Sequence, residues 1–260
     1  MTARMLDQVN KIQSDGPDVR RRPQPEEGPL SVLYEDEEVV VLDKPPGVVV
    51  HPTYRNTSGT LLNAVLWRYR DRPGVQPGIL TRLDKDTSGV VIVALTPALH
   101  AAMQREMATG HIRKQYLALV FGVPSPASGR IALPLGRSAE DRRVVIVRAD
   151  GAACATDYQL VAHWTGAGET IACVRCELLT GRTHQIRVHL AARGWPIVGD
   201  AVYGRVASGI SRQALHARRV TFAHPITRQE ITVESPLPGD FESLIPDDGE
   251  RDLVMSAGRA

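Results

Sequence analysis

The chain has 260 residues, of which 43% are hydrophobic, and its formal net charge at pH 7 is +2. This length allows one large or two small domains with a hydrophobic core. No run of about 18 apolar residues occurs and the N-terminus is polar, so the composition argues against membrane insertion and secretion and favours a cytoplasmic protein. The three cysteines are too few for a disulfide scaffold.

The N-terminal part of the chain changes character near residue 30. Residues 1–29 contain proline and alternating charge blocks with little apolar periodicity, which predicts a flexible leader. Residues 30–246 are predicted to form the folded domain, and residues 247–260 a flexible tail. The domain begins with two or three short strands, interrupted by the acidic turn Glu35–Glu38 and by a Pro-Pro-Gly breaker.

The middle of the chain alternates between helical and strand patterns. Apolar residues recur at helical spacing from Leu61, after Thr57, Ser58 or Thr60 as possible N-caps. The apolar run 90–96 predicts a central strand, and a helix follows it from Pro97 to a stop at Gly110. Strand-like segments then dominate. Runs of strands with a few inserted helices predict an α+β fold on a largely antiparallel or mixed sheet.

The second half combines a short helix with an excess of arginine. A helix is predicted from about Thr183 to its terminator Gly194, and strands close the domain. Between residues 181 and 220 the sequence contains seven arginines and only one acidic residue, Asp200. This excess could form a cationic face although the whole chain is nearly neutral. Scattering of these arginines over solvated surfaces is the alternative.

Two patterns that often bind metals do not support a metal site here. Cys173 and Cys176 have a C-x-x-C spacing, but they lie in an alternating segment where residues three apart point to opposite faces of a strand. His184 and His189 are five residues apart, whereas two histidines that share one metal on a helix are four apart. We therefore predict that the protein holds no metal.

The segment TRLDKDTSGVVIVALT contains the most informative cluster, Asp84 and Asp86 on either side of a lysine. Such a pair can bind a divalent cation, supply a nucleophile, or cap a turn. Enzymes that transfer phosphoryl groups through an aspartate place it after an apolar strand, whereas here the apolar run follows. This order argues against a metal-dependent phosphatase.

Two further residues are candidates on spacing alone. His184 and Arg187 lie on one predicted helix face with Val188 and Ala191, so they could present hydrogen-bond donors to a cleft. Tyr116 lies on a predicted strand, where packing in the core would also explain it.

Together these stretches resemble the RluA-type pseudouridine synthases, which isomerise chosen uridines in structured RNA. The resemblance covers nearly all of residues 30–245, and the matching segments occur in the expected order. They are VVVLDKPPGVVVHP, RLDKDTSGVVIVA, RKQYLALVFG, LLTGRTHQIRVHLAARGWPIVGDAVYG, ALHARRVTFAHP and PLPGDF.

The resemblance implies a pseudouridine synthase catalytic fold, with a mixed, mostly antiparallel sheet, flanking helices and a central cleft that binds RNA. It implies that Asp84 is the essential aspartate, which attacks the ribose or assists formation of a glycal. Arg187 would pair with Asp84 and keep it charged and aimed. Tyr116 would lie against the target uracil and serve as the base that removes the last proton. No cofactor is required.

The resemblance also implies contacts with RNA, either ribosomal or transfer RNA. Arg82 would fill the space that the flipped target nucleotide leaves. The RNA contacts are predicted to include Arg182, His184 and Arg218, with arginines binding phosphates. Thr81 stands where the family has histidine, which is the main departure from its pattern.

The remaining expectations concern partners and alternatives. No protein partner is expected, so the chain should act as a monomer, and the leader is too short to be the accessory RNA-binding domain of some relatives. Asp86 is expected to stabilise the turn into the strand rather than to react. A non-catalytic RNA-binding module would also carry the arginines, but it would have no use for Asp84, Tyr116 and Arg187 in their motifs.

Overall fold

A computed structural model of the chain describes residues 23–54, 56–166, 168–247 and 249–257. The strands are β1 (Ser31–Glu35), β2 (Val39–Lys44), β3 (Gly78–Ile79), β4 (Ser88–Ala94), β5 (Arg113–Phe121), β6 (Ser128–Ile131), β7 (Leu135–Arg137), β8 (Val145–Val147), β9 (Thr156–Gly166), β10 (Glu169–Leu178), β11 (Leu215–Ala223) and β12 (Glu230–Glu234). The helices are α2 (Leu61–Arg68), α3 (Pro97–Ala108), α4 (Gln185–Ala192), α5 (Gly239–Glu242) and α6 (Glu250–Ser256).

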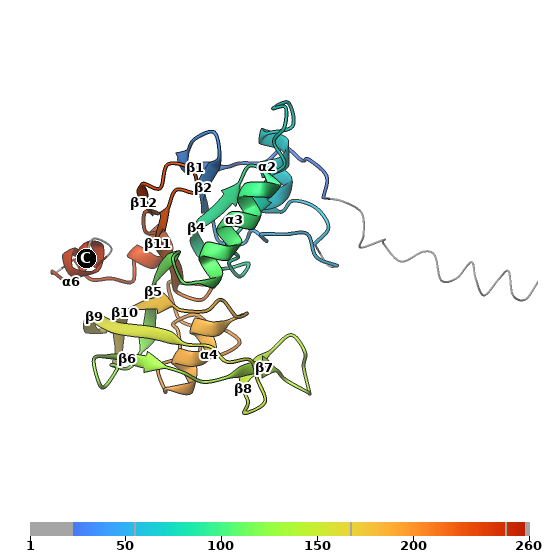
Figure 1. The fold of residues 1–260 in the computed structure, drawn as a ribbon. Coiled ribbons are helices and arrows are strands. Elements are labelled where there is room, and N and C mark those ends of the chain that lie inside the picture. Colours follow the sequence, from blue (N-terminus) through green and yellow to red (C-terminus); the bar gives the residue numbers. More distant parts are fainter. Residues whose placement is uncertain (1–22, 55, 167, 248, 258–260) are drawn as a thin grey trace, which may run out of the picture.

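One 10-stranded sheet runs through the molecule in the order β1-β2-β4-β11-β5-β10-β9-β6, with β3 also paired to β4 and β12 to β11. The separate hairpin β7–β8 lies beside α4 (Figure 1). Neighbouring strands of the large sheet are antiparallel, except that β4 and β11 run parallel over two residue pairs. The predicted α+β fold with a mixed, mostly antiparallel sheet is therefore confirmed.

The parallel junction between β4 and β11 depends on a glycine. Gly89 has φ +110°, and a Cβ atom there would lie 2.2 Å from the carbonyl oxygen of Ala217. No other residue type could occupy this position without moving β11. Beside it, Ser88 Oγ and His216 Nδ1 lie 3.0 Å apart. The close approach places the loop before β4, which carries Asp84, at the centre of the sheet.

Helices cover both faces of the half of the sheet that β2 and β4 form (Figure 1). On one face, Leu61 and Val65 of α2 pack against Val40 and Leu42, and on the other, Met103 of α3 packs against a cluster that includes Ile92. Burial on both faces explains why β2 and β4 are continuous apolar runs rather than alternating ones. The other half of the sheet packs its own core against α4, α5 and α6.

The predicted helix starts are confirmed in detail. Thr60 is the N-cap of α2 and forms a reciprocal capping box with Asn63. Thr96 caps α3, and Pro97 is the first helical residue. Each cap satisfies backbone donors that a helix terminus leaves without partners.

The two ends of the domain differ from the predicted leader and tail. Residues 1–22 lie outside the described residues, but Gln24 and Glu26 bind the start of α2, through Asn63 Nδ2 and the Gly59 N–H. Near the C-terminus, α6 forms where a flexible tail was predicted. Its Val254 is fully buried against the core, which orders the segment despite its polar composition.

The structure also shows the state of the cysteines and whether any described helix could span a membrane. The three thiols are free and buried, and burial raises the pKa of Cys173 and Cys176, which keeps both protonated. Among the described residues, no helix has the length and apolar character that crossing a membrane requires.

The buried His216 makes stability depend on pH. Burial lowers the pKa of His216 from 6.5 to about 3, so the folded protein holds it neutral while the unfolded chain binds a proton as pH falls below 6.5. The free energy of unfolding should therefore fall on acidification, by about 1.4 kcal/mol per pH unit from this residue. We expect His216→Gln to lose less stability than the unaltered protein between pH 7 and 5, as measured by urea unfolding.

The exposed His163 on β9 supplies the control, because His163→Gln removes an imidazole that is not buried in the core. Equal losses in the unaltered protein and in His216→Gln would contradict this account of the β4–β11 junction.

Candidate active site

One pocket opens where the loop before β4, strand β5 and the start of α4 meet. Its lining residues are Arg82, Leu83, Asp84, Thr87, Tyr116, Leu178, Arg182, His184, Gln185, Ile186, Arg187 and Leu215. All the site residues predicted from the sequence are among them except Arg218. Segments that lie about 100 residues apart in the chain therefore form one site.

The main chain of the loop that carries Asp84 is held by donors from distant segments. Lys44 donates to the carbonyl oxygen of Lys85 at 2.9 Å, and Arg212 donates to that of Asp86 at 3.1 Å. Gln213 donates to the hydroxyl of Thr87 at 3.1 Å. Since these donors come from β2 and from the segment before β11, the fold fixes where the loop presents Asp84.

Lys44 is a fully buried cation that binds backbone instead of a carboxylate. Its ammonium also donates to the carbonyl oxygens of Pro45 and Val48, so three acceptors satisfy its three donors. Burial lowers the pKa of Lys44 to about 8, although the charge of Asp86 acts in the opposite direction. The ordered Pro-Pro-Gly turn and the loop of Asp84 are thus joined through one side chain.

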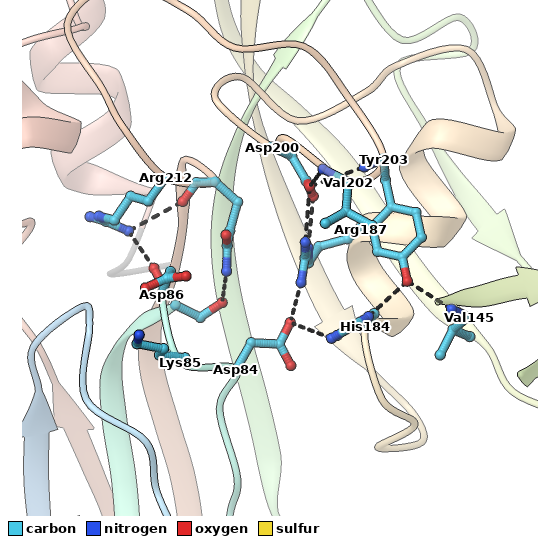
Figure 2. Close-up of polar contacts among 12 residues, drawn as sticks. Asp84, Lys85, Asp86, Val145, His184, Arg187, Asp200, Val202, Tyr203 and Arg212 are labelled. Atoms are coloured by element: carbon cyan, nitrogen blue, oxygen red, sulfur yellow. Dashed lines mark hydrogen bonds and ion pairs between the residues drawn. The ribbon is translucent and has the colours of Figure 1, made fainter. Parts of the chain in front are cut away.

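Arg187 lies between two carboxylates (Figure 2). Its Nε and Nη2 donate to Asp200 at 2.7 and 2.9 Å, and its Nη1 donates to Asp84 Oδ2 at 2.9 Å. Burial alone would lower the pKa of Arg187, but the hydrogen bonds from it to Asp200 and the charges of both carboxylates raise it above its ordinary value. Arg187 is therefore a fixed cation that is aimed at Asp84 by its contact with Asp200.

Asp200 is fully buried and is held by its own loop. The backbone N–H groups of Val202 and Tyr203 donate to its Oδ1 at 3.0 and 3.1 Å. Burial would raise the pKa of Asp200, yet the hydrogen bonds from Arg187 hold it below the usual range. The loop also needs Gly199, which has φ +76° and no room for a Cβ atom beside the carbonyl of Arg212.

His184 lies near the same carboxylate oxygen of Asp84 that Arg187 binds. Its Nδ1 lies 2.7 Å from the hydroxyl of Tyr203, and its Nε2 lies 3.8 Å from Asp84 Oδ2, which is longer than a hydrogen bond. His184 precedes α4 and has φ 55°, so it is not part of the helix face predicted from the sequence. Burial lowers the pKa of His184, which favours the neutral imidazole.

Tyr116 of β5 forms the inner wall of the pocket. The residue is only 6% exposed, and burial, with a smaller effect from the charge of Asp84, raises the pKa of its hydroxyl. A tyrosine in this environment stays protonated at neutral pH.

The arginines that were predicted to contact RNA do not all reach the pocket. Arg82 and Arg182 line it, and Arg82 is exposed. Arg218 is buried instead and pairs at 3.3 Å with Glu234 of β12, the strand next to β11 in the sheet. The contact of Arg218 with RNA therefore stays a prediction, while its burial and its pairing with Glu234 are structural. Thr81 is also structural, since its hydroxyl accepts the backbone N–H of Ile92 at 2.9 Å.

The structure adds site residues that the sequence analysis did not single out. Tyr203 and Lys44 were visible only as members of matching segments, and Asp200 also as the one acid in an arginine-rich stretch. Lys114, half-buried near Tyr116, lines a second, smaller pocket, and burial lowers its pKa. No group of three or more histidine, cysteine or acidic residues is placed to hold a metal ion within the part of the chain that the structure describes.

Comparison with known proteins settles the family. The model of the family described as RNA pseudouridylate synthase matches residues 38–192. The chain belongs to the RNA pseudouridylate synthase family. The resemblance to RluA-type synthases found in the sequence is confirmed, and the protein is an isomerase.

Relatives of this synthase match over most of its length. Ribosomal large subunit pseudouridine synthase D of Xanthomonas campestris pv. campestris is 40% identical over 236 residues, covering 85% of this chain and 70% of the relative. The uncharacterized RNA pseudouridine synthase YlyB of Bacillus subtilis is 38% identical over 221 residues, covering 83% and 72%. Among solved structures, human RNA Pseudouridylate Synthase Domain Containing 1 has a TM-score of 0.67 and 27% identity, covering 90% of this chain and 98% of its own.

The contact between Arg187 and Asp200 gives a direct test of the site. Asp200→Asn removes the buried charge that aims Arg187 and leaves that cation with Asp84 alone. We expect a loss of about 3 kcal/mol in the free energy of unfolding. We also expect a fall of about 100-fold in kcat in the folded variant, because Arg187 loses its alignment with Asp84. Urea unfolding and steady-state assays on RNA measure the two effects.

Asp157→Asn is the matched control, because Asp157 forms the same two-bond contact with Arg130 on the surface. It should change neither stability nor kcat appreciably. If Asp200→Asn behaved like this control, Arg187 would not depend on Asp200.

Proposed function

We propose that this synthase isomerises chosen uridines in structured RNA to pseudouridine, with Asp84 as the nucleophile. The observation that carries the proposal is the position of Asp84, at the pocket between Tyr116 and Arg187. Relatives named for the ribosomal large subunit support ribosomal RNA as the substrate. We propose that residues 30–246, together with α6 packed against their core, form the catalytic domain, which acts as a monomer in the cytoplasm.

The proposed reaction needs only one carboxylate and a space in which uracil can turn. An oxygen of Asp84 attacks the anomeric carbon, and the electron pair of the bond to nitrogen leaves with the uracil. After the uracil turns, its C5 attacks the same carbon and displaces the carboxylate. Loss of the C5 proton completes an isomerisation that is balanced without an oxidant or a cofactor. Removal of the ribose C2′ proton by Asp84 is the second route that the same arrangement permits.

Tyr116 is better suited to hold the uracil than to remove the final proton. Its hydroxyl is protonated at neutral pH, because burial raises its pKa, and the ring forms the pocket wall. We propose that the target uracil packs against this ring while it turns. The sequence-based proposal of Tyr116 as the base would require prior loss of the phenolic proton, which this environment opposes.

The target base must leave the RNA stack to reach this pocket. We propose that Arg82, exposed at the pocket two residues before Asp84, fills the space that the flipped base leaves. A planar cation can stack and donate hydrogen bonds there, which offsets part of the few kcal/mol that extrusion costs. Arg182 would bind phosphates around this opening, and Lys114 would do so at the second pocket, which shares Tyr116 with the first.

The two aspartates of the D-x-D pair make a matched test of the nucleophile. Asp84→Asn should abolish formation of pseudouridine and leave RNA binding within a few fold, since phosphate contacts supply most of the affinity. Asp86→Asn should retain most activity, because it is the backbone of Asp86 that Arg212 binds. Pseudouridine mapping and filter binding give the two readouts, and full activity of Asp84→Asn would refute the proposed mechanism.

The role of Arg82 is testable through the substrate. Arg82→Ala should lower kcat by about 10- to 100-fold on a duplex target. The loss should be smaller when the target uridine is mismatched, because less stacking and pairing must then be broken. Arg113→Ala, which removes an exposed arginine paired with Glu230, should show neither effect. The same loss on both substrates would argue against the flipping role.

A further inference from the structure

The two oxygens of Asp84 have different surroundings. Arg187 Nη1 donates to Oδ2 at 2.9 Å, and His184 Nε2 lies 3.8 Å from the same oxygen. Oδ1 makes no hydrogen bond to the residues that the structure describes, whereas Oδ2 accepts one from Arg187 (Figure 2). Since Asp84 lines the pocket, one of its oxygens is occupied by the protein while the other remains available to a substrate.

Tyr203 connects the partners of Asp84 to one another. Its ring lies 4.9 Å from the guanidinium carbon of Arg187, within cation–π distance, and its hydroxyl lies 2.7 Å from His184 Nδ1. Its backbone N–H donates to Asp200. A shift of Tyr203 would therefore disturb both groups that approach Oδ2.

The hydrogen bonds of Tyr203 decide which nitrogen of His184 carries the proton. The phenolic oxygen accepts the backbone N–H of Val145 at 2.8 Å, a donor that cannot change its role. If the Tyr203 hydroxyl donates to Nδ1 of His184, every proton has an acceptor, and Nε2–H points toward Asp84. If Nδ1–H of His184 instead donates to the Tyr203 hydroxyl, the hydroxyl proton has no acceptor among the described residues. The lone pair of Nε2 then points toward the carboxylate of Asp84.

The protonation states agree with this arrangement. Burial raises the pKa of Tyr203, which keeps the phenol protonated, and burial lowers the pKa of His184, which keeps the imidazole neutral. A neutral imidazole can receive a hydrogen bond at Nδ1 and present N–H at Nε2, whereas a protonated one has no lone pair for Tyr203.

We propose that His184 and Tyr203 are positioning residues that, together with Arg187, occupy Oδ2 of Asp84 and leave Oδ1 as the oxygen that reacts with the ribose. This inference rests on the proposed function of Asp84 and adds which oxygen reacts and what selects it. It also changes the role of His184, which was expected from the sequence to contact RNA.

The two roles of His184 predict different kinetic effects. An RNA contact would chiefly affect KM, since it would bind substrate before and during the reaction alike. A positioning residue would chiefly affect kcat, because the orientation of Asp84 matters when the new bond forms.

Two substitutions of His184 separate its two nitrogens. In His184→Gln the terminal amide can occupy the place of Nε2 and donate toward Asp84. In His184→Asn the shorter amide reaches only the place of Nδ1, although asparagine tolerates the positive φ of 55° better. We expect kcat to fall about 10- to 100-fold in His184→Asn and less in His184→Gln, with KM within a few fold of that of the unaltered protein. A purely conformational role would give the reverse order.

Tyr203→Phe tests the selection of the tautomer directly. The ring remains against Arg187, but the donor to Nδ1 is lost, so His184 should populate both neutral tautomers. Two-bond ¹⁵N–¹H correlation spectra of the imidazole should show Nε2–H in the unaltered protein and a mixture in Tyr203→Phe, together with a lower kcat. Tyr158→Phe, which removes a buried hydroxyl bonded to the carbonyl of Pro126, should change neither.

The outcomes separate this inference from the proposed function. An active Asp84→Asn would refute the proposed function and this inference together. An inactive Asp84→Asn would leave the proposed function intact. If kcat in both His184→Asn and Tyr203→Phe then equalled that of the unaltered protein, or if His184 carried its proton on Nδ1, the inference alone would be refuted.

Discussion

The ion contacts of Arg187 with Asp84 and Asp200 are the constraint on which the active site depends. Asp200 is fully buried and accepts two hydrogen bonds from the guanidinium, while Asp84 lines the pocket and accepts one. A guanidinium that is bound on two of its nitrogens by a buried group has little freedom to rotate. The N–H of the third nitrogen, Nη1, therefore has a fixed direction, and it points at Asp84.

The fold fixes the same aspartate from the side of its main chain. Lys44, Arg212 and Gln213 bind the loop at its carbonyl oxygens and at one hydroxyl, and Gly89 allows β4 to approach β11 immediately after the loop. Backbone contacts thus set where Asp84 stands, and side-chain contacts set how its carboxylate is turned. Lys44 and Arg212 donate to carbonyl oxygens of this loop, so neither competes with Arg187 for the carboxylate of Asp84.

The sequence predicted the parts of the site that depend on local pattern. The segments around Asp84, Tyr116 and Arg187 were identified because their motifs are contiguous, and the structure brings the three residues to one pocket. Asp200 was visible only as a lone acid among arginines. Its contact with Arg187 depends on a loop that returns to α4, which the sequence pattern does not show. The sequence pattern did not show that Arg218 would be buried beside Glu234, because that pairing depends on two strands meeting in the sheet. The tail was expected to be flexible from its polar composition, whereas α6 forms there with Val254 buried against the core.

The most direct test of the account is a crystal structure of the synthase bound to RNA whose target uridine carries fluorine at C5, which blocks loss of the last proton. The account predicts that Oδ1 of Asp84 lies within about 3.5 Å of the anomeric carbon, or is bonded to it, while Arg187 and His184 remain on Oδ2. A target ribose that approaches Oδ2, or lies beyond reach of both oxygens of Asp84, would contradict it.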